Sequence, residues 1–329
     1  MSPRAKAVAL KATPRRRATG LDAHVAQPLA TTNGTGTADR LGVRKTYKLY
    51  IGGEFPRTES GRAYEVFGAR GEPLANACRA TRKDIRDAVR AARQAQPGWS
   101  SRTAFNRSQI LYRIAELMEG RRDQFIGEVM VAEGLGRRRA TRLVDAAIDR
   151  WVWYAGWADK FSQVNGTVNQ VAGSYFNFSV PEPTGVVGVI APEGSSLLGL
   201  VSRLAPVIVS GNCAVVLASE SRPLPAVTLT EVLATSDVPG GVVNLITGLR
   251  RELVTHLAGH MDVNALDAYG LDPAQGAAVE ELATENVKRL IRPPRGGADA
   301  VDWLSPRAQS PYLIGEFTET KTVWHPIGS

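Results

Sequence analysis

The chain has 329 residues, of which 43% are hydrophobic and 22% are charged, as is ordinary for a soluble globular protein with a sizeable core. No apolar stretch approaches the ~18 residues needed to cross a bilayer, which argues against a membrane protein. Only two cysteines occur, which argues against a disulfide framework or a cysteine-rich metal site. We therefore expect a cytoplasmic protein.

Residues 1–44 are predicted to form a disordered basic tail. Residues 1–40 contain seven Lys and Arg against two Asp, so they carry +5 of the formal net charge of +8. The segment is rich in Ala, Thr and Gly and has no sustained apolar periodicity. A nucleic-acid or membrane-surface role for "PRRRA" is one interpretation, a solvated tail is the more common one, and an organelle transit peptide would look similar.

Residues 45–172 are predicted to open with two short strands, "KLYIGGEF" and "AYEVFGARGE", and to continue as helices. Thr81 and Asp84 have the spacing of a capping box at the start of the first helix. Two longer helices are expected around residues 110–118 and 142–161. The second carries a stripe of Trp and Tyr that we interpret as packing residues rather than as a cofactor site.

A strand is predicted within residues 173–184, in "SYFNFSVPEP", and residues 185–292 then alternate between apolar runs and helical stretches. The expected strands are Val186–Ala191, Ala214–Ala218, Val242–Ile246, Val263–Ala268 and Lys288–Ile291. The expected helices are Leu197–Val209, Ala226–Ala234, Arg251–Ala258 and Ala274–Asn286. This alternation is typical of a parallel sheet with right-handed crossovers. The predicted fold class is therefore α/β, a Rossmann-like parallel sheet with flanking helices and a small additional β element.

The alternation stops after residue 292. Residues 293–311 are rich in turn formers and are predicted to be a linker. Residues 312–329 contain "EFTETKTVW", which alternates as a strand does.

Several phrases together resemble the aldehyde dehydrogenase superfamily, in the order in which that family has them. They are "LYIGGEF", "YAGWADK", "EPTGVVGVIAP", "GNCAVVLASE", "PGGVVNLITG", "HMDVNALDAYG" and "ENVKRL". The resemblance runs from about Tyr47 to Leu290. It implies a dinucleotide-binding domain made of residues 45–172 and 185–292, with NAD or NADP as cofactor. It also implies that residues 173–184 and 312–329 are oligomerisation strands. Family members oxidise aldehydes to acids or acyl thioesters with a nucleophilic cysteine.

The resemblance places cofactor contacts at Ile190, Pro192, Glu220 and Gly270. Glu220 corresponds to the glutamate that binds the adenosine ribose in the family. A surface carboxylate that merely follows a strand is an equal interpretation of this residue. No metal site is expected, because His256 and His260 share a helix face without an apparent third ligand.

Other positions depart from the family pattern. The turn that reads Trp-Asn in the family is Glu193-Gly194 here, which puts a carboxylate where an oxyanion needs a hydrogen-bond donor. The ribose-binding lysine corresponds to Leu217. Arg250 stands where relatives usually have glycine; it could attract phosphate together with Arg251, or both could start a solvated helix. Leu271 replaces a serine at a helix N-terminus.

No catalytic residue is assigned. The position of the family's general base falls at or near Pro293, and only about twenty residues separate Pro293 from Tyr312, far fewer than the ~100 that a separate catalytic domain requires. Cys213 reads as an inert core residue, and Cys78 lies far from the nucleotide domain in sequence. We therefore expect residues 293–311 to replace the catalytic domain.

Three functional hypotheses remain. The first is a non-catalytic structural or regulatory subunit, which forms a hetero- or homo-oligomer with an aldehyde dehydrogenase through the edge strands around Tyr175–Val180 and in "EFTETKTVW". The second is an active NAD-dependent aldehyde dehydrogenase with atypical site residues. The third is a nucleotide- or nucleic-acid-binding module that uses the basic tail. The first is favoured, and neither membrane nor nucleic acid is an expected partner.

Overall fold

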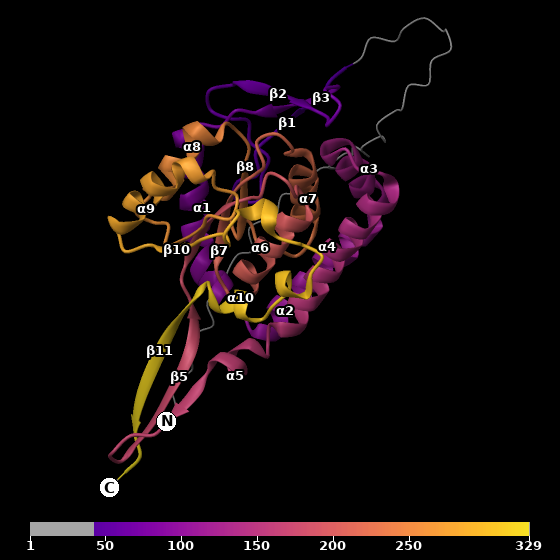
Figure 1. Ribbon diagram of the computed structural model, residues 1–329. Coiled ribbons are helices and arrows are strands. Elements are labelled where there is room, and N and C mark those ends of the chain that lie inside the picture. The colour runs from indigo at the N-terminus through magenta and orange to yellow at the C-terminus, as the bar shows by residue number, and fades with distance from the viewer. Residues whose placement is uncertain (1–42, 329) are drawn as a thin grey trace, which may run out of the picture. The chain divides into compact units, whose positions relative to one another are not determined.

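The computed structural model describes residues 43–328, so the predicted basic tail lies outside the described residues except for its last two positions. The described part opens with a three-stranded sheet of strands β1 (Thr46–Tyr47), β2 (Ala63–Phe67) and β3 (Pro73–Cys78), in the order β1-β3-β2 (Figure 1). Strand β3 pairs in parallel with β1 and antiparallel with β2. Of the two predicted leading strands, "AYEVFGARGE" contains β2, whereas "KLYIGGEF" forms only isolated bridges, from Tyr50 to Leu245 and from Ile51 to Glu54.

Five helices follow: α1 (Arg82–Ser100), α2 (Ala104–Gly120), α3 (Arg122–Glu133), α4 (Arg137–Trp157) and α5 (Phe161–Asn165). Helix α1 begins at the predicted capping box, where the Asp84 carboxylate accepts a hydrogen bond of 2.7 Å from the backbone N–H of Thr81. The aromatic stripe of α4 is mainly core, because Trp151 and Tyr154 are fully buried. No helix within residues 43–328 combines the length and the apolar character that crossing a membrane requires.

The central sheet has five parallel strands in the order β10-β9-β6-β7-β8. They are β6 (Val186–Ile190), β7 (Cys213–Leu217), β8 (Val243–Ile246), β9 (Ala265–Asp267) and β10 (Arg289–Ile291). The connecting helices are α6 (Leu198–Val209), α7 (Leu224–Thr235), α8 (Arg250–Ala258) and α9 (Gly276–Thr284). Every predicted strand and helix of residues 185–292 is present, with ends within two residues of the expected ones.

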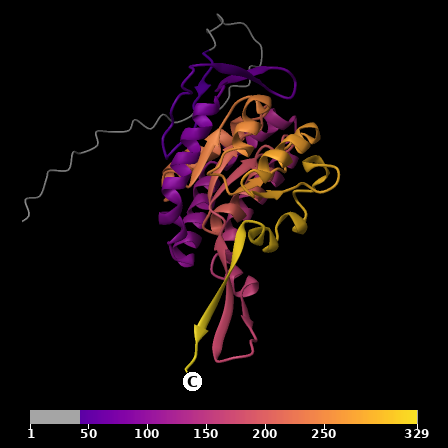
Figure 2. The same ribbon diagram turned by 90° about the vertical axis from the view of Figure 1, so that its left-hand side faces the viewer.

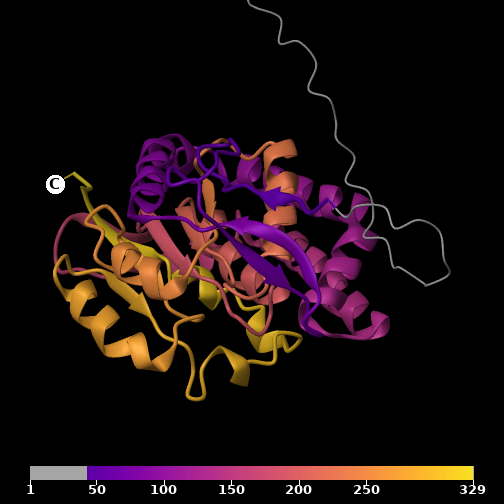
Figure 3. The same ribbon diagram turned by 90° about the horizontal axis from the view of Figure 1, so that it is seen from above.

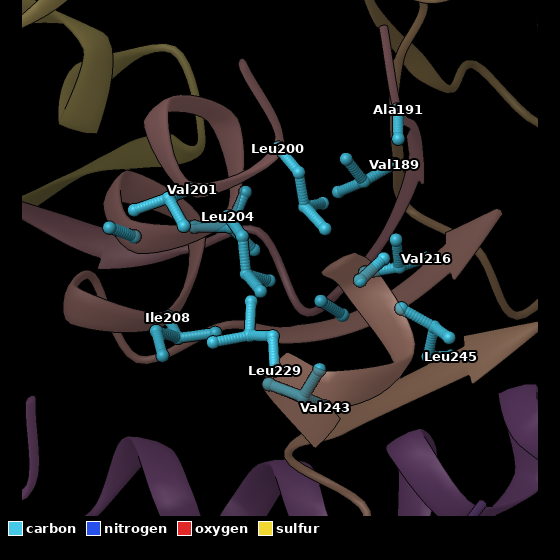
Figure 4. Packing of buried hydrophobic residues seen from close by; sticks show 14 of the residues in the cluster. Val189, Ala191, Leu200, Val201, Leu204, Ile208, Val216, Leu229, Val243 and Leu245 are labelled. Atoms are coloured by element: carbon cyan, nitrogen blue, oxygen red, sulfur yellow. The ribbon is translucent and has the colours of Figure 1, made fainter. Parts of the chain in front are cut away.

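Helices cover both faces of this sheet, which confirms the predicted Rossmann-like α/β class (Figure 3). Helices α1, α8 and α9 contact one face, and α6 and α7 contact the other, with α2, α3 and α4 packed outside α6 and α7. The central strands β6 and β7 are apolar along their whole length because both faces of the sheet are covered. Figure 4 shows Leu200 of α6 beside Val189 of β6, and Ile208 of α6 beside Leu229 of α7.

A second, antiparallel sheet joins the two predicted oligomerisation segments (Figure 2). It consists of β4 (Thr167–Asn169), β5 (Tyr175–Pro183) and β11 (Thr318–Pro326), in the order β11-β5-β4. Strand β5 is paired on both sides, with β11 along its full length and with β4 over part of it. The expectation that Tyr175–Val180 is an edge strand is therefore wrong. The open edges belong to β4 and β11.

Residues 293–311 are not the loose linker that their composition predicts. They form two 3₁₀ turns, Ala298–Ala300 and Pro306–Ala308, and lead into α10 (Tyr312–Gly315). The buried guanidinium of Arg150, on α4, donates to the carbonyls of Trp303 and Ala308. Arg203 on α6 ion-pairs with Asp267 of β9 and with Glu316, so the C-terminal segment is tied to the sheet. Hydrogen bonds and ion pairs of buried polar groups hold this segment in place. Such contacts produce no periodic pattern of apolar residues in the sequence.

Candidate functional site

The site predicted for the cofactor lies where strands β6 and β9 end side by side. These strands are neighbours in the sheet but not in the chain, so the strand order reverses between them, and ligands of open α/β folds bind at such a point. The backbone N–H of Gly270 donates to the carbonyl of Ile190 at 2.9 Å. A Cβ atom on residue 270 would lie 2.0 Å from the carbonyl oxygen of Ala191, so only glycine fits there. The two strand ends are therefore in direct contact.

The side chain of Arg250 fills the space between these strand ends. Arg250 is the first residue of α8, and only 8% of its surface is exposed. Its guanidinium donates to the carbonyl oxygens of both Ala191 and Gly270. Neither sequence interpretation of Arg250, a free phosphate-binding cation or part of a solvated helix start, is correct. Arg251 does point to solvent, as the second interpretation has it.

The Glu193 carboxylate completes an ion pair with this guanidinium, at 2.8 Å between Nε of Arg250 and Oε1 of Glu193. Glu193 also accepts hydrogen bonds from the hydroxyl groups of Ser219 and Ser221 and from the backbone N–H of Glu220, at 2.7 to 2.8 Å. Burial alone would raise the pKa of Glu193, but the Arg250 charge and these donors outweigh it and hold the pKa below its usual value. Glu193 is therefore a fixed anion.

Two further carboxylates, those of Glu220 and Glu133, lie at the N-terminal ends of helices α8 and α6. Glu220 accepts a hydrogen bond of 2.7 Å from the backbone N–H of Arg250, so it caps α8. Glu133, at the end of α3, accepts from both the backbone N–H and the hydroxyl of Ser196, just before α6. A helix N-terminus attracts anions, and here both helices that flank the site already hold one from the chain itself.

The structure thus brings the four predicted cofactor residues into one region, but it engages them with each other. Ile190 and Gly270 share a backbone hydrogen bond, Pro192 is buried in the turn after β6, and Glu220 caps α8. The sequence did not point to Ser219, Ser221 or Glu133. Ser219 and Ser221 donate to the Glu193 carboxylate, and Glu133 accepts from Ser196 just before α6. The run Ser219-Glu220-Ser221 directly after a strand was the available signal for the first two.

The residues present do not fit a dinucleotide. A pyrophosphate in this fold needs free backbone N–H groups at the helix that follows the first strand, and Glu133 holds the N–H of Ser196. It also needs open space at the strand ends, which the Arg250 guanidinium fills. The carboxylates of Glu193 and Glu220 add negative charge beside that position.

Both cysteines of the chain are buried and unbonded. Cys213 begins β7 with no exposed surface, and burial raises the pKa of its thiol to about 12. Cys78 ends β3 and is 3% exposed. Because a nucleophilic cysteine needs an accessible thiolate, neither position suits that role. Among residues 43–328, no three His, Cys, Asp or Glu side chains are arranged so that they could hold a metal ion.

Comparisons with known proteins give a consistent assignment. The model of the aldehyde dehydrogenase family matches residues 57–300. Cytosolic aldehyde dehydrogenase 1 of Elephantulus edwardii is 30% identical over 250 residues, which are 74% of this chain and 49% of that protein. The NADP(+) D-glyceraldehyde dehydrogenase of Picrophilus torridus is 30% identical over 259 residues, 78% of this chain and 52% of the relative.

Solved structures agree with the sequence comparisons. The NAD+ complex of an aldehyde dehydrogenase from Bacillus cereus superposes with a TM-score of 0.70 at 26% identity, covering 74% of this chain and 50% of that one. The chain thus spans about half the length of the relatives it matches. Its sequence, its fold and the position of its strand-end site all agree with one assignment, and the chain belongs to the aldehyde dehydrogenase family.

Proposed function

We propose that this chain is a non-catalytic member of the aldehyde dehydrogenase family, a structural or regulatory subunit that pairs with a complete aldehyde dehydrogenase. The observation that carries the proposal is the Arg250 guanidinium, which donates to the carbonyls of Ala191 and Gly270 and pairs with Glu193. The chain's own side chains take the place that a dinucleotide would need. Hydride transfer to NAD or NADP therefore has no site in this part of the chain.

The buried thiols support the same conclusion. Thiol modification of the native full chain at neutral pH should leave Cys78 and Cys213 unreacted, and both should react after unfolding. Fast modification of either thiol in the native chain would contradict this and would favour the alternative, an active enzyme with atypical site residues.

The pairing surface that we propose is the open edge of the antiparallel sheet. Strand β11 has nine residues, and seven of the nine side chains are exposed. Its outer edge has no partner strand within residues 43–328. Trp324 of β11 and Tyr175 and Phe176 of β5 are large apolar side chains with 44 to 58% of their surface exposed. An unpaired edge with exposed aromatic groups is suited to adding a strand from another subunit.

The first experiment measures cofactor binding and turnover by the full chain alone. We expect no aldehyde-dependent formation of NADH and no binding of NAD+ or NADP+ at the strand ends. Arg250→Gly removes the guanidinium from the strand ends, and Glu193→Gln removes the fixed anion beside it. If the double variant binds NAD+ more tightly than the parent chain does, the plugged site is supported. NADH formation by the parent chain would refute the proposal.

The second experiment tests pairing. The tagged full chain is co-expressed with a complete aldehyde dehydrogenase, and the purified complex is weighed by native mass spectrometry. Trp324→Asp changes the exposed edge strand, and Met261→Asp places the same charge at a site with 65% of its surface exposed, outside the antiparallel sheet. We expect only Trp324→Asp to dissociate the complex. A full chain that stays monomeric beside such an enzyme would contradict the pairing role.

A further inference from the structure

The start of helix α4 carries a dense cluster of arginines that the family resemblance does not explain. Arg137, Arg138, Arg139 and Arg142 lie within six consecutive residues and are all exposed. They line one cavity of about 640 Å³, together with Gly136 and Leu304. We call these four residues the arginine cluster. Its cavity shares no lining residue with the Arg250 site, and it plays no part in the proposed function.

The charge of the arginine cluster is largely uncompensated. Arg137 pairs with Asp123 at 2.7 Å, but both side chains are mostly exposed, so this ion pair is weak. The other three arginines form no ion pair with any residue between 43 and 328. By contrast, Arg121, the N-cap of α3, and Arg122, its first residue, each have a carboxylate partner. The arginine cluster therefore has charge available for a ligand.

The position of the arginine cluster on the helix makes its charge still less favourable in the free protein. The first turn of α4 has no acidic residue, and a helix N-terminus already carries partial positive charge. Its N-cap is Gly136, which offers no side-chain acceptor to the first backbone N–H groups. The guanidinium groups of the arginine cluster therefore lie at the same end of the helix as its partial positive charge, although the carbonyl of Gly136 already accepts from the backbone N–H of Arg139. Only an anion would relieve both.

The cavity also has one apolar side chain in its lining, Leu304. Leu304 belongs to the segment that Arg150 holds by donating to the carbonyl of Trp303 at 2.9 Å. Arg150 is itself on α4, so the same helix carries the arginine cluster and anchors the segment that contains Leu304. The Asp302 carboxylate accepts a hydrogen bond of 3.1 Å from the backbone N–H of Leu304. The volume falls in the range of small-molecule sites.

We propose that this cavity binds a small molecule with at least two linked phosphate groups, whose phosphates are held by Arg138, Arg139 and Arg142. Planar guanidinium groups match phosphate oxygens with paired hydrogen bonds, and several of them together select a dense anion over a single carboxylate. The confinement of the charge to six residues favours a small ligand over a nucleic acid, which needs an extended basic stripe.

The test titrates inorganic triphosphate into the full chain by calorimetry, at about 50 and 200 mM salt. We expect saturable binding by the parent chain and a loss of affinity of about 100-fold or more in the triple variant Arg138→Gln, Arg139→Gln, Arg142→Gln. A triple Arg→Lys variant at the same positions keeps the charge but not the paired hydrogen bonds. We expect it to bind about tenfold more weakly than the parent.

The matched control removes the same charge elsewhere, through Arg57→Gln, Arg90→Gln and Arg251→Gln, three exposed positions outside the cavity. We expect its affinity to stay within about threefold of the parent, because only long-range attraction changes. All variants are first shown to fold by circular dichroism. Equal losses in control and cluster variants would overturn the proposal, as would absence of binding in the parent chain.

Two further arms identify the ligand. ADP and inorganic pyrophosphate share a diphosphate. If ADP binds more tightly than pyrophosphate and Leu304→Asp abolishes this difference, we infer that Leu304 contacts the organic part of the ligand. A short DNA duplex should not compete with triphosphate at about 200 mM salt. If it does compete, and if its binding depends on the arginine cluster, the surface recognises an extended polyanion and the small-molecule proposal is wrong.

Discussion

A buried carboxylate on α3, Glu128, makes the stability of this protein depend on pH in a predictable direction. Glu128 is 7% exposed and lies between α3 and α7. Its Oε1 atom accepts hydrogen bonds from the hydroxyl of Thr228 at 2.8 Å and from the amide of Gln124 at 3.1 Å. Its Oε2 atom is buried without a partner. The charged form is therefore poorly solvated.

Burial, with a smaller contribution from the nearby Glu231 charge, raises the pKa of Glu128 from 4.5 to about 7, although Thr228, Gln124 and Lys45 oppose the shift. The contribution of neutral Glu128 to the free energy of unfolding is fully present below pH 4.5, and it is lost as the pH rises to about 7. Glu128→Gln keeps the shape and the acceptor without the charge. We expect it to stabilise the fold by about 3 kcal/mol at about pH 8, and by less than about 1 kcal/mol at about pH 5.

Urea unfolding followed by tryptophan fluorescence, at both pH values, measures these free energies of unfolding. Glu119→Gln is the matched control, because Glu119 is an exposed carboxylate on α2, and it should change stability by less than about 0.5 kcal/mol at either pH. A Glu128→Gln variant that is less stable than the parent at the higher pH would refute the reasoning. An equal difference at both pH values would do the same.

Two other substitutions test the contacts that hold the strand ends and the C-terminal segment. In thermal unfolding, Gly270→Ala should destabilise the fold by about 3 kcal/mol or more, because the new Cβ would lie 2.0 Å from the Ala191 carbonyl oxygen. Gly276→Ala, with open space around it, should be neutral or slightly stabilising in the same assay. Arg203→Leu leaves Asp267 as a fully buried unpaired carboxylate and should cost about 3–5 kcal/mol, and adding Asp267→Asn should restore part of that loss in urea unfolding.

Local patterns in the sequence were sufficient for the central fold. The strands of residues 185–292 are short and mostly apolar, and they alternate with helices whose apolar residues have helical spacing. This alternation was sufficient to predict the parallel α/β sheet. The same holds for the capping box at Thr81 and Asp84, whose partners are three residues apart. The departures from the family at Glu193 and Pro293 are likewise readable from residue identity.

The contents of the site were decided by the tertiary structure. Glu193, Glu220 and Arg250 follow or precede different strands, and nothing local in the sequence shows that their side chains meet. They meet because parallel strands end at one edge of the sheet, where the strand order reverses. Residues 293–311 have no apolar period either, yet Arg150 holds them through backbone carbonyls. Periodicity reports which face of an element is buried, whereas contacts of single polar groups depend on where distant elements come together in space.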